Sequence, residues 1–354
     1  MFSVPVPSVG PSNARIFILA EAPGEKEVER GVPLVGPSGQ ELRRMLSTVG
    51  ISLDECYKAN VFSRRPADNN LALYGQPDPT EETKSYGPLT SNPITYLRPE
   101  FLPELERVYR EIAAVRPNVV LALGNTATWA LGLGTGITSI RGSVQVAHLM
   151  ELQRPLKVLP TFHPALVLRQ WDQRVIVLAD LEKCLAESHT PEFTFDNTEL
   201  WLNPTLEDLV DFDARYMERA QECAADIETK RGQITAISFS PDPSIVLAIP
   251  FWIEGPSPNY WPTPSTEAQA WSFVRKWMER RDLVKIFQNG LYDLQYLAHI
   301  CTPRACSEDT MIAHHSLYTE LRKGLGFLGS IYCNVSSWKN MRTFRREEQL
   351  KRDD

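Results

Sequence analysis

Three acidic residues in the second half of the chain have the types and spacing of a metal-dependent hydrolytic site. Asp226 and Glu228 are two apart in the run Ala-Asp-Ile-Glu, and Asp293 follows Asn289 by four positions. Side chains two apart point to the same side of a β-strand, and side chains four apart share one face of a helix. Carboxylate oxygens are preferred ligands of Mg²⁺ and Mn²⁺, and two such ions can hold the attacking and leaving oxygens of a phosphodiester. We therefore predict a divalent-metal site here; the alternative for Asp226 and Glu228 is a solvated strand edge.

The residues between these two motifs have the pattern of strands and a helix. Residues 233–240 alternate and predict a strand, and residues 266–280 carry Trp271, Val274 and Trp277 at helical spacing. Residues 283–288 are a short apolar run that leads into Asn289. This order predicts a small α/β domain in which the carboxylates converge from a strand and a helix.

In order and spacing, this part of the chain resembles the DnaQ-like 3′–5′ exonucleases, in particular the proofreading domain of bacterial and bacteriophage family A DNA polymerases. Asp226-x-Glu228 is similar to the first motif of that family and Asn289-x-x-x-Asp293 to the second, over about residue 203 to the end of the chain. The resemblance implies a ribonuclease H-like α/β domain with a mixed sheet. It implies that Asp226, Glu228 and Asp293 are the catalytic ligands of Mg²⁺ or Mn²⁺. It further implies that Asn289 contacts the substrate, which is single-stranded DNA or a DNA 3′ end.

The third motif of that family, Tyr-x-x-x-Asp on a helix, has no counterpart after Asp293. Three explanations remain open: the chain is a fragment, the missing helix comes from a separate DNA polymerase subunit, or the nuclease is inactive. Asp353 and Asp354 could stand in for the missing ligand, although acidic residues at a chain end are more often disordered.

Composition limits the class of protein. A chain of 354 residues predicts two domains, and its 43% hydrophobic content is ordinary for a globular protein. No apolar run approaches a membrane span, and the six scattered cysteines lack a C-x-x-C pair, which favours a reducing cytoplasm and no membrane association. The net charge of −7 argues against sequence-independent coating of DNA. Local basic patches remain possible, from Arg64, Arg65, Arg141, Arg169 and Arg174.

A polar stretch at residues 188–204 predicts a boundary, which gives a first domain at 1–190, a linker at 191–204 and a second domain at 205–354. Within the first domain, short apolar strands alternate with helices. The strands are expected at 15–20, 57–61, 118–123 and 156–160, and the helices at 38–48, 102–115, 126–131 and 172–186. This alternation predicts a parallel sheet covered by helices on both faces.

Polar residues follow three of these strands, where the chemistry of such sheets is usually placed. Glu21 follows the first strand, Asn60 ends the second and His163 follows the fourth. Each has an ordinary structural reading, as part of a turn, a strand-end cap or a buried imidazole. Their repetition at three strand ends favours one common site.

A glycine-rich turn before the first predicted helix is a further candidate. The run Ser38-Gly-Gln-Glu41 predicts an N-terminal capping box, and Gly36 and Gly39 allow close approach to free backbone N–H groups. This predicts a phosphate seat that includes Gly36 and Ser38.

Together these features resemble the uracil-DNA glycosylase superfamily, most closely its family 4, over about residues 15–187. The resemblance implies a three-layer α/β/α domain in which Glu21 handles the hydrolytic water and Asn60 pairs with an extruded base. His163 would hydrogen-bond the uracil oxygen, where negative charge builds during cleavage. Arg141 with the glycine after it matches a further landmark of the family and is counted with the substrate-binding residues.

Two departures from family 4 qualify that expectation. Leu34 stands where the family has an aromatic residue that stacks on uracil, which removes about 1–3 kcal/mol of base binding. The four cluster cysteines of the family are also missing, so we predict no iron–sulfur cluster. We expect uracil excision to be slow or absent.

The two resemblances together are typical of the N-terminal part of some bacteriophage family A DNA polymerases. The first hypothesis is a metal-dependent 3′–5′ exonuclease with a glycosylase-like DNA-binding domain. The second is a non-catalytic DNA-binding accessory subunit, or a split piece of a polymerase.

Overall fold

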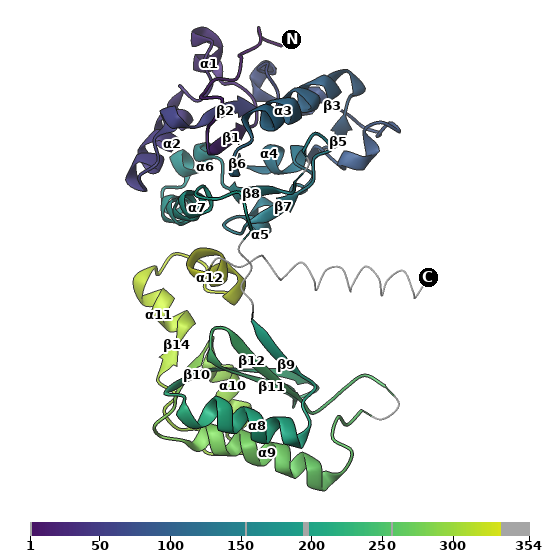
Figure 1. The fold of residues 1–354 in the computed structure, drawn as a ribbon. Helices are drawn as coiled ribbons and strands as arrows, with labels where there is room; N and C mark the ends of the chain where they lie inside the picture. The colour runs from purple at the N-terminus through teal and green to yellow at the C-terminus, as the bar shows by residue number, and fades with distance from the viewer. Residues whose placement is uncertain (1, 153, 194–197, 256–257, 334–354) are drawn as a thin grey trace. The chain divides into compact units, whose positions relative to one another are not determined.

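The computed structural model describes residues 2–152, 154–193, 198–255 and 258–333. The chain folds into two compact units (Figure 1). The first unit contains Met1–Thr194 together with the chain from Gly326 onward, and the second contains Phe195–Leu325. The domain boundary at 191–204 stays a prediction. No helix within the described ranges is both long and apolar enough to cross a membrane.

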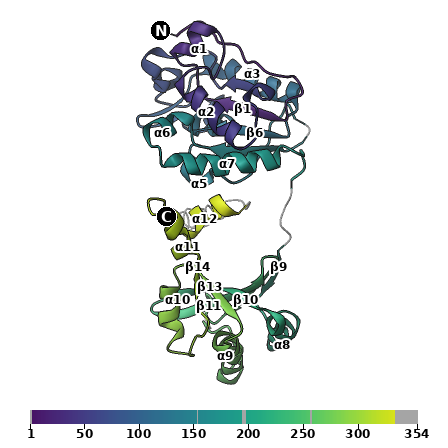
Figure 2. The same ribbon diagram turned by 90° about the vertical axis from the view of Figure 1, so that its left-hand side faces the viewer.

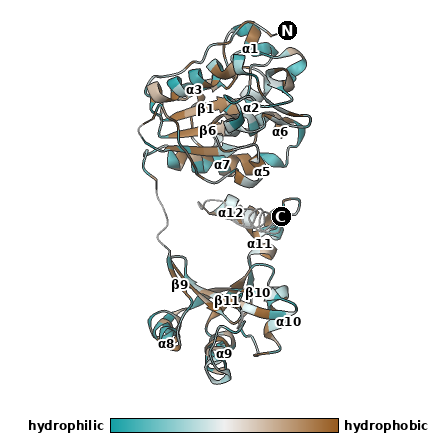
Figure 3. Ribbon diagram, turned by 90° about the vertical axis from the view of Figure 1, so that its right-hand side faces the viewer, coloured by the Kyte–Doolittle hydropathy of each residue, from teal (hydrophilic) through white to brown (hydrophobic). Residues whose placement is uncertain are grey.

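The first unit is built on a five-stranded sheet with the order β2-β1-β6-β8-β7. Neighbouring strands are parallel except at the edge, where β7 runs antiparallel to β8. The strands are β1 (Ile16–Ala20), β2 (Tyr57–Asn60), β6 (Val119–Leu123), β7 (Gln145–Ala147) and β8 (Leu156–Thr161). β1, β6 and β8 are buried along their whole length, and β1 and β6 are correspondingly apolar throughout (Figure 3).

Helices cover both faces of this sheet. Phe17 and Leu19 pack on the face that carries α3 (Leu102–Val115) and α4 (Asn125–Ala130), whereas Ile16 and Ile18 pack on the opposite face. That opposite face carries α2 (Pro37–Thr48), α6 (Pro164–Arg169) and α7 (Gln173–Glu187). The predicted three-layer α/β/α class is confirmed.

Smaller elements complete the first unit. They are α1 (Glu25–Arg30), α5 (Ile137–Ile140), and a small sheet of β3 (Gly75–Gln76), β5 (Ile94–Leu97) and β4 (Thr90–Ser91). The small sheet lies in the stretch that the sequence shows only as a long loop. It is anchored by Tyr74, whose ring stacks on Phe62 with centroids 3.8 Å apart.

The chain returns to the first unit in α12 (Leu325–Tyr332). The Lys183 ammonium donates to the backbone oxygens of Ser330 at 2.6 Å and Cys333 at 2.7 Å. A cation at the carboxyl end of a helix satisfies carbonyl groups that have no partner within the helix.

The second unit has a six-stranded mixed sheet with the order β14-β13-β10-β11-β12-β9. β10, β11 and β12 form an antiparallel meander, whereas the pairs β10–β13, β13–β14 and β12–β9 are parallel. The strands are β9 (Glu199–Leu202), β10 (Glu222–Lys230), β11 (Gln233–Asp242), β12 (Ile245–Pro250), β13 (Val284–Phe287) and β14 (Glu308–Asp309). The mixed sheet of the predicted fold class is confirmed.

Two long helices lie on one side of this sheet, α8 (Leu206–Arg215) and α9 (Pro264–Glu279) (Figure 2). Phe212 and Trp277 of these helices join one core with the inward residues of β10. The Trp277 indole N–H donates at 2.7 Å to Asp213, which also pairs with Lys276, so this polar group in the core is satisfied. The remaining helices are α10 (Gly290–Leu297) and α11 (Thr310–Leu317).

Candidate functional sites

A pocket of about 380 Å³ opens at the carboxyl ends of the strands in the first unit. Parallel strands place their carboxyl ends at one sheet edge, so the residues after β1, β2 and β8 meet there. The structure brings five of the predicted site residues into the lining of this pocket: Glu21, Leu34, Ser38, Asn60 and His163.

His163 is held in one orientation by the helix that it begins. It is the N-cap of α6, and its Nδ1 atom accepts a hydrogen bond from the Ala165 N–H at 3.2 Å. Burial, followed by the charge of Arg169, lowers the pKa of His163 to about 4, so the imidazole is neutral at pH 7. Because Nδ1 is the acceptor, Nε2 carries the proton and is the available donor.

The glycine that precedes α4 makes room for this imidazole. Gly124 has φ +83°, and a Cβ there would lie 3.2 Å from the Cβ of His163. Both the backbone conformation and the space favour glycine at this position.

Glu21 and Asn60 present acceptor and donor groups to the same pocket. The Glu21 carboxylate accepts a hydrogen bond from the Thr126 hydroxyl, which fixes its position above the sheet. Asn60 is only 5% exposed, and its backbone oxygen accepts from Arg107 at 2.6 Å. No side-chain hydrogen bond of Asn60 occurs in the described part of the chain, so its amide keeps its full capacity for a ligand.

The predicted phosphate seat at α2 is already taken by an internal carboxylate. α2 begins at Pro37 with Gly36 as its N-cap and no side-chain cap, so the capping box predicted from Ser38 and Glu41 is not formed. The reason is that proline at the first helical position starts the helix one residue earlier and draws Ser38 into its first turn. The Gly36 N–H donates at 2.8 Å to Glu27, which is 6% exposed.

The second glycine of this turn serves internal packing. A Cβ at Gly39 would lie 2.1 Å from the backbone oxygen of Leu34. Leu34 itself has φ +57° and is buried against the core while its edge lines the pocket. Leu34 thus contributes a branched aliphatic side chain to the lining of the pocket.

Arg141 does not lie with these residues. Its guanidinium is 2% exposed and pairs with the fully buried Asp180, which also accepts from the Thr161 hydroxyl at 2.7 Å. Arg141 also donates to the Ser330 hydroxyl at 3.0 Å. Because this charge is buried and paired, its role in this structure is to hold α7 and α12 against the sheet, and the predicted contact with substrate is not supported.

The other predicted basic residues are dispersed. Arg169 is exposed and lines the pocket, whereas Arg174 donates at 3.1 Å to Glu41 on α2. Arg64 is exposed and donates to the backbone oxygen of Ser3 at 3.1 Å. Arg169 is therefore the one of these three that faces the pocket.

Among the described residues, no three His, Cys, Asp or Glu side chains are placed to hold one metal ion. The cysteines are free thiols, and burial raises the pKa of Cys56 to about 12. The absence of an iron–sulfur cluster stays a prediction, and the visible absorbance of the purified protein tests it.

In the second unit, the predicted carboxylates lie on two elements, Asp226 and Glu228 on β10 and Asp293 on α10. Asp226 and Glu228 project from the exposed side of β10, opposite the buried Ile227. Asp293 on α10 is 3% exposed and accepts a hydrogen bond from the Ile227 N–H at 3.0 Å. Burial, assisted by the charges of Asp226 and Asp309, raises the pKa of Asp293 to about 6.

Asn289 positions the start of α10 through its backbone. It is the N-cap of this helix in the left-handed region, with φ +62°. The N–H groups of Asn289 and Gly290 donate to Asp309 at 3.2 and 2.8 Å, and Asp309 also caps α11 by accepting from Met311 and Ile312. Burial disfavours the charged form of Asp309, but these four N–H groups outweigh it and hold its pKa below the ordinary value.

The donor set of Asp226, Glu228 and Asp293 consists only of carboxylate oxygens, which suits a hard divalent cation. The pKa of Asp293 is raised chiefly by burial and to a smaller extent by the charge of Asp226, and a bound cation would favour its ionised form. In the described part of the chain the three are not placed to hold one metal ion together. Asp353 and Asp354 lie outside the described residues.

The chain belongs to the uracil DNA glycosylase superfamily, whose family model matches residues 7–187. It is 30% identical to the type-4 uracil-DNA glycosylase of Archaeoglobus fulgidus over 184 residues, 50% of this chain and 79% of that protein. It is 33% identical to the type-4 enzyme of Thermotoga maritima over 178 residues, 49% of this chain and 78% of that protein.

A third relative extends over both units. The chain is 26% identical to a DNA polymerase of Bacillus phage SP01 over 327 residues, which is 83% of this chain and 31% of the polymerase. The chain therefore spans about a third of that relative's length. Solved structures with some likeness include Brucella melitensis NrnC with bound Mg²⁺, at a TM-score of 0.27 and 21% identity over 39% of this chain and 61% of that one. The catalytic core of RRP6 from Trypanosoma brucei has a TM-score of 0.31 and 17% identity over 41% of this chain and 37% of that one.

Proposed function

We propose that the second unit is a 3′–5′ exonuclease that hydrolyses DNA phosphodiesters with Mg²⁺ or Mn²⁺. The observation that carries the proposal is the hydrogen bond from the Ile227 N–H to Asp293, because it fixes a buried carboxylate beside the strand that bears Asp226 and Glu228. The bound ions supply charge stabilisation at the attacking and leaving oxygens. Asp226, Glu228 and Asp293 hold them, and Asn289 and the start of α10 orient the 3′-terminal nucleotide.

The first unit acts in this proposal as a DNA-binding domain that receives an extruded base. Asn60 pairs with the polar edge of the base, and the Nε2–H of the neutral His163 donates to a base oxygen that gains negative charge as the glycosidic bond stretches. Glu21 accepts a proton from, or orients, the water that attacks the sugar. Because Leu34 gives the base no ring to stack on, base binding is weakened and we expect excision to be slow or absent.

Similarity to the polymerase of Bacillus phage SP01 supports a place in a phage replication system, as part of a family A DNA polymerase or beside one. The second candidate is a non-catalytic DNA-binding accessory subunit. It is favoured by one observation, that the three carboxylates do not form a finished ligand group within the described ranges.

The test is hydrolysis of a single-stranded oligonucleotide labelled at its 5′ end, with Mg²⁺ or Mn²⁺ present. Wild type should shorten the strand from its 3′ end, and Asp226→Asn should abolish this while its thermal unfolding stays unchanged. Equal hydrolysis by wild type and Asp226→Asn would refute the assignment. Activity that rises only when a polymerase polypeptide is added would support the accessory subunit.

A further inference from the structure

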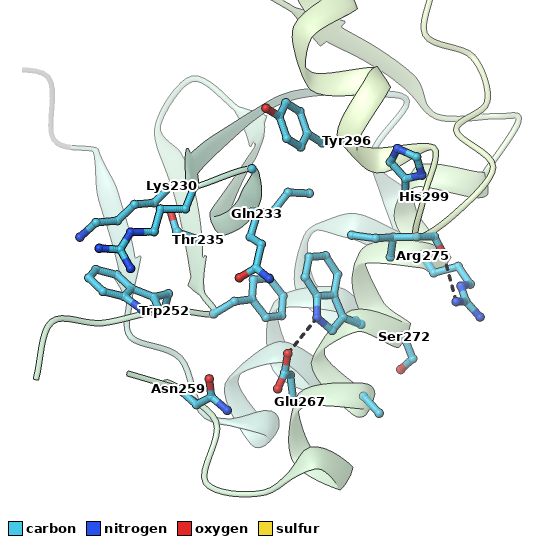
Figure 4. A pocket seen from close by; sticks show the side chains of 17 residues that line it. Lys230, Gln233, Thr235, Trp252, Asn259, Glu267, Ser272, Arg275, Tyr296 and His299 are labelled. Atoms are coloured by element: carbon cyan, nitrogen blue, oxygen red, sulfur yellow. Dashed lines mark hydrogen bonds between the residues drawn. The ribbon is translucent and has the colours of Figure 1, made fainter. Parts of the chain in front are cut away.

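A second pocket in the second unit, of about 1050 Å³, lies beyond the three carboxylates, between the β10–β11 hairpin and helices α9 and α10 (Figure 4). Sites for single small ligands usually measure about 300–1,000 Å³, so this one is large for a mononucleotide. Its size and shape suit a segment of an extended chain.

The lining combines aromatic rings with positive charge. Three cations, Lys230, Arg231 and Arg275, line the pocket with one carboxylate, Glu267, and Lys230 also pairs with Glu254 at 3.7 Å. The chain as a whole carries a net charge of −7, so this concentration of cations runs against its average. A local basic pocket on an acidic protein attracts a specific polyanion without general coating.

Two tryptophans supply flat surfaces. The ring of Trp271 stacks on Phe251 with centroids 3.7 Å apart and planes 9° from parallel, and its indole N–H donates to Glu267 at 3.4 Å. Trp252 lies under the Lys230 ammonium, which is 3.8 Å from the ring centroid. Aromatic rings interleaved with cations are the usual surface for stacked bases and their phosphates.

The turn of the β10–β11 hairpin places Arg231 at the edge of the pocket in a strained backbone conformation. Arg231 and Gly232 both have positive φ, +52° and +79°, which is the pattern of a two-residue type I′ turn. Asparagine, aspartate or glycine usually fills the first of these positions. An arginine at this position is strained, and it brings a guanidinium group beside the pocket.

The two elements that carry the carboxylates, β10 and α10, also contribute to the lining of this pocket. Lys230 is two residues after Glu228 on β10 and shares its side of the strand, at a Cα separation of about 7 Å. On α10, Tyr292 follows the second motif's Asn289 and bonds to the Thr229 hydroxyl, and its ring lies 5.2 Å from that of Tyr296, which lines the pocket.

We infer that this pocket binds single-stranded DNA, holding nucleotides that lie outside the cleavage site. Bases stack on Trp252 and Trp271, and backbone phosphates contact Lys230, Arg231 and Arg275. Where the bound nucleotides lie along the strand, relative to the cleaved end, rests on the proposed nuclease function. The affinity of the pocket for single strands is a separate property.

The experiment measures fluorescence anisotropy of labelled oligothymidylates with the full chain in EDTA, so that binding is read without hydrolysis. EDTA removes the metal ions, so binding by wild type is the reference for every variant. Trp252→Ala should weaken binding of a long oligonucleotide by about 5- to 100-fold. Arg281→Ala, at an exposed arginine that does not line the pocket, is the matched control and should change nothing.

Salt dependence separates phosphate contact from a mere loss of packing. Replacing Lys230 and Arg275 together by glutamine should lower the slope of log affinity against log salt by about 1.4, since each phosphate contact to a single strand contributes about 0.7. An unchanged slope and affinity in these variants, with thermal unfolding as in wild type, would overturn the inference. Competition by thymidine monophosphate as strong as by the oligonucleotide would overturn it too, because it would indicate a mononucleotide site. If wild type binds the oligonucleotide but does not hydrolyse it when metal is present, the nuclease proposal is refuted and the inferred DNA-binding pocket stands.

Discussion

Asp293 accepts a hydrogen bond from the backbone N–H of Ile227, the residue that lies between Asp226 and Glu228. β10 pairs with β13 only as far as Ala224, so the N–H of Ile227 has no partner strand on that side. The carboxylate of Asp293 replaces the missing strand and fastens α10 to β10. A single side chain thereby joins the two sequence motifs.

This double role predicts different outcomes for two substitutions of Asp293. Asp293→Asn keeps an acceptor for the Ile227 N–H, so we expect a folded protein that has lost metal-dependent hydrolysis. Asp293→Ala leaves a buried N–H without a partner, which should cost about 1–3 kcal/mol of unfolding free energy as well. Urea unfolding followed by circular dichroism, alongside the nuclease assay, measures both. Equal stability of the two variants would contradict the structural half of this role.

The lowered pKa of His163 predicts a pH-dependent stability. Its pKa is about 4 in the folded chain, against an ordinary value near 6.5. Between these values the unfolded chain binds the proton more readily, so the contribution is complete above about pH 6.5 and is lost as the pH falls toward 4. Wild type should therefore lose more unfolding free energy between pH 7 and 4.5 than His163→Gln does. Parallel pH profiles for the two proteins would contradict a neutral buried imidazole.

The aliphatic side chain of Leu34 in the first pocket predicts poor uracil excision, and replacing it with an aromatic ring tests this. We expect wild type to release uracil from single-stranded DNA slowly or not at all. Leu34→Phe should restore a stacking surface and raise base binding by about 5- to 100-fold. Abasic-site formation on a uracil-containing oligonucleotide measures the outcome, with His163→Ala as the control that removes the donor. Rapid excision by wild type that His163→Ala abolishes would show that stacking is dispensable here.

The buried pair of Arg141 and Asp180 predicts a large stability effect with no ligand involved. Arg141→Met leaves the fully buried Asp180 without its main partner and should cost about 3–5 kcal/mol. The double variant Arg141→Met, Asp180→Leu should recover most of that loss, because apolar side chains can replace a buried ion pair. Thermal unfolding of both proteins decides this, and a neutral single variant would show that the pair is not buried in solution.

Most of the first unit's architecture could be predicted because its strands are short and apolar on both faces. The expected helix at 102–115 coincides with α3, and the strand ends after β1, β2 and β8 meet as predicted. The edge strand β7 escaped prediction because three residues carry no usable alternation. The small sheet of β3, β5 and β4 escaped it because its strands are held by Tyr74 and its contacts rather than by local pattern.

The residues that sequence reasoning misjudged are those whose partners are distant in the chain. Arg141 with the glycine after it resembles a landmark of the family, but it is buried in an ion pair with Asp180, thirty-nine positions later. Asp309 has only a local signal in the sequence, as an aspartate that directly precedes an apolar helical run and caps it. The basic pocket had no linear signal, because the hairpin tip, α9 and α10 each contribute only part of it.

The Glu27 carboxylate at the start of α2 affects how the first unit responds to anions in solution. A helix start of this kind usually attracts free anions from the buffer, and here a side chain of the same molecule neutralises it. Phosphate and sulfate in the medium therefore have no free binding site at the start of α2. Raising the concentration of these salts should therefore weaken DNA binding by this unit only through charge screening. A protein that keeps a vacant oxyanion site would show additional competition.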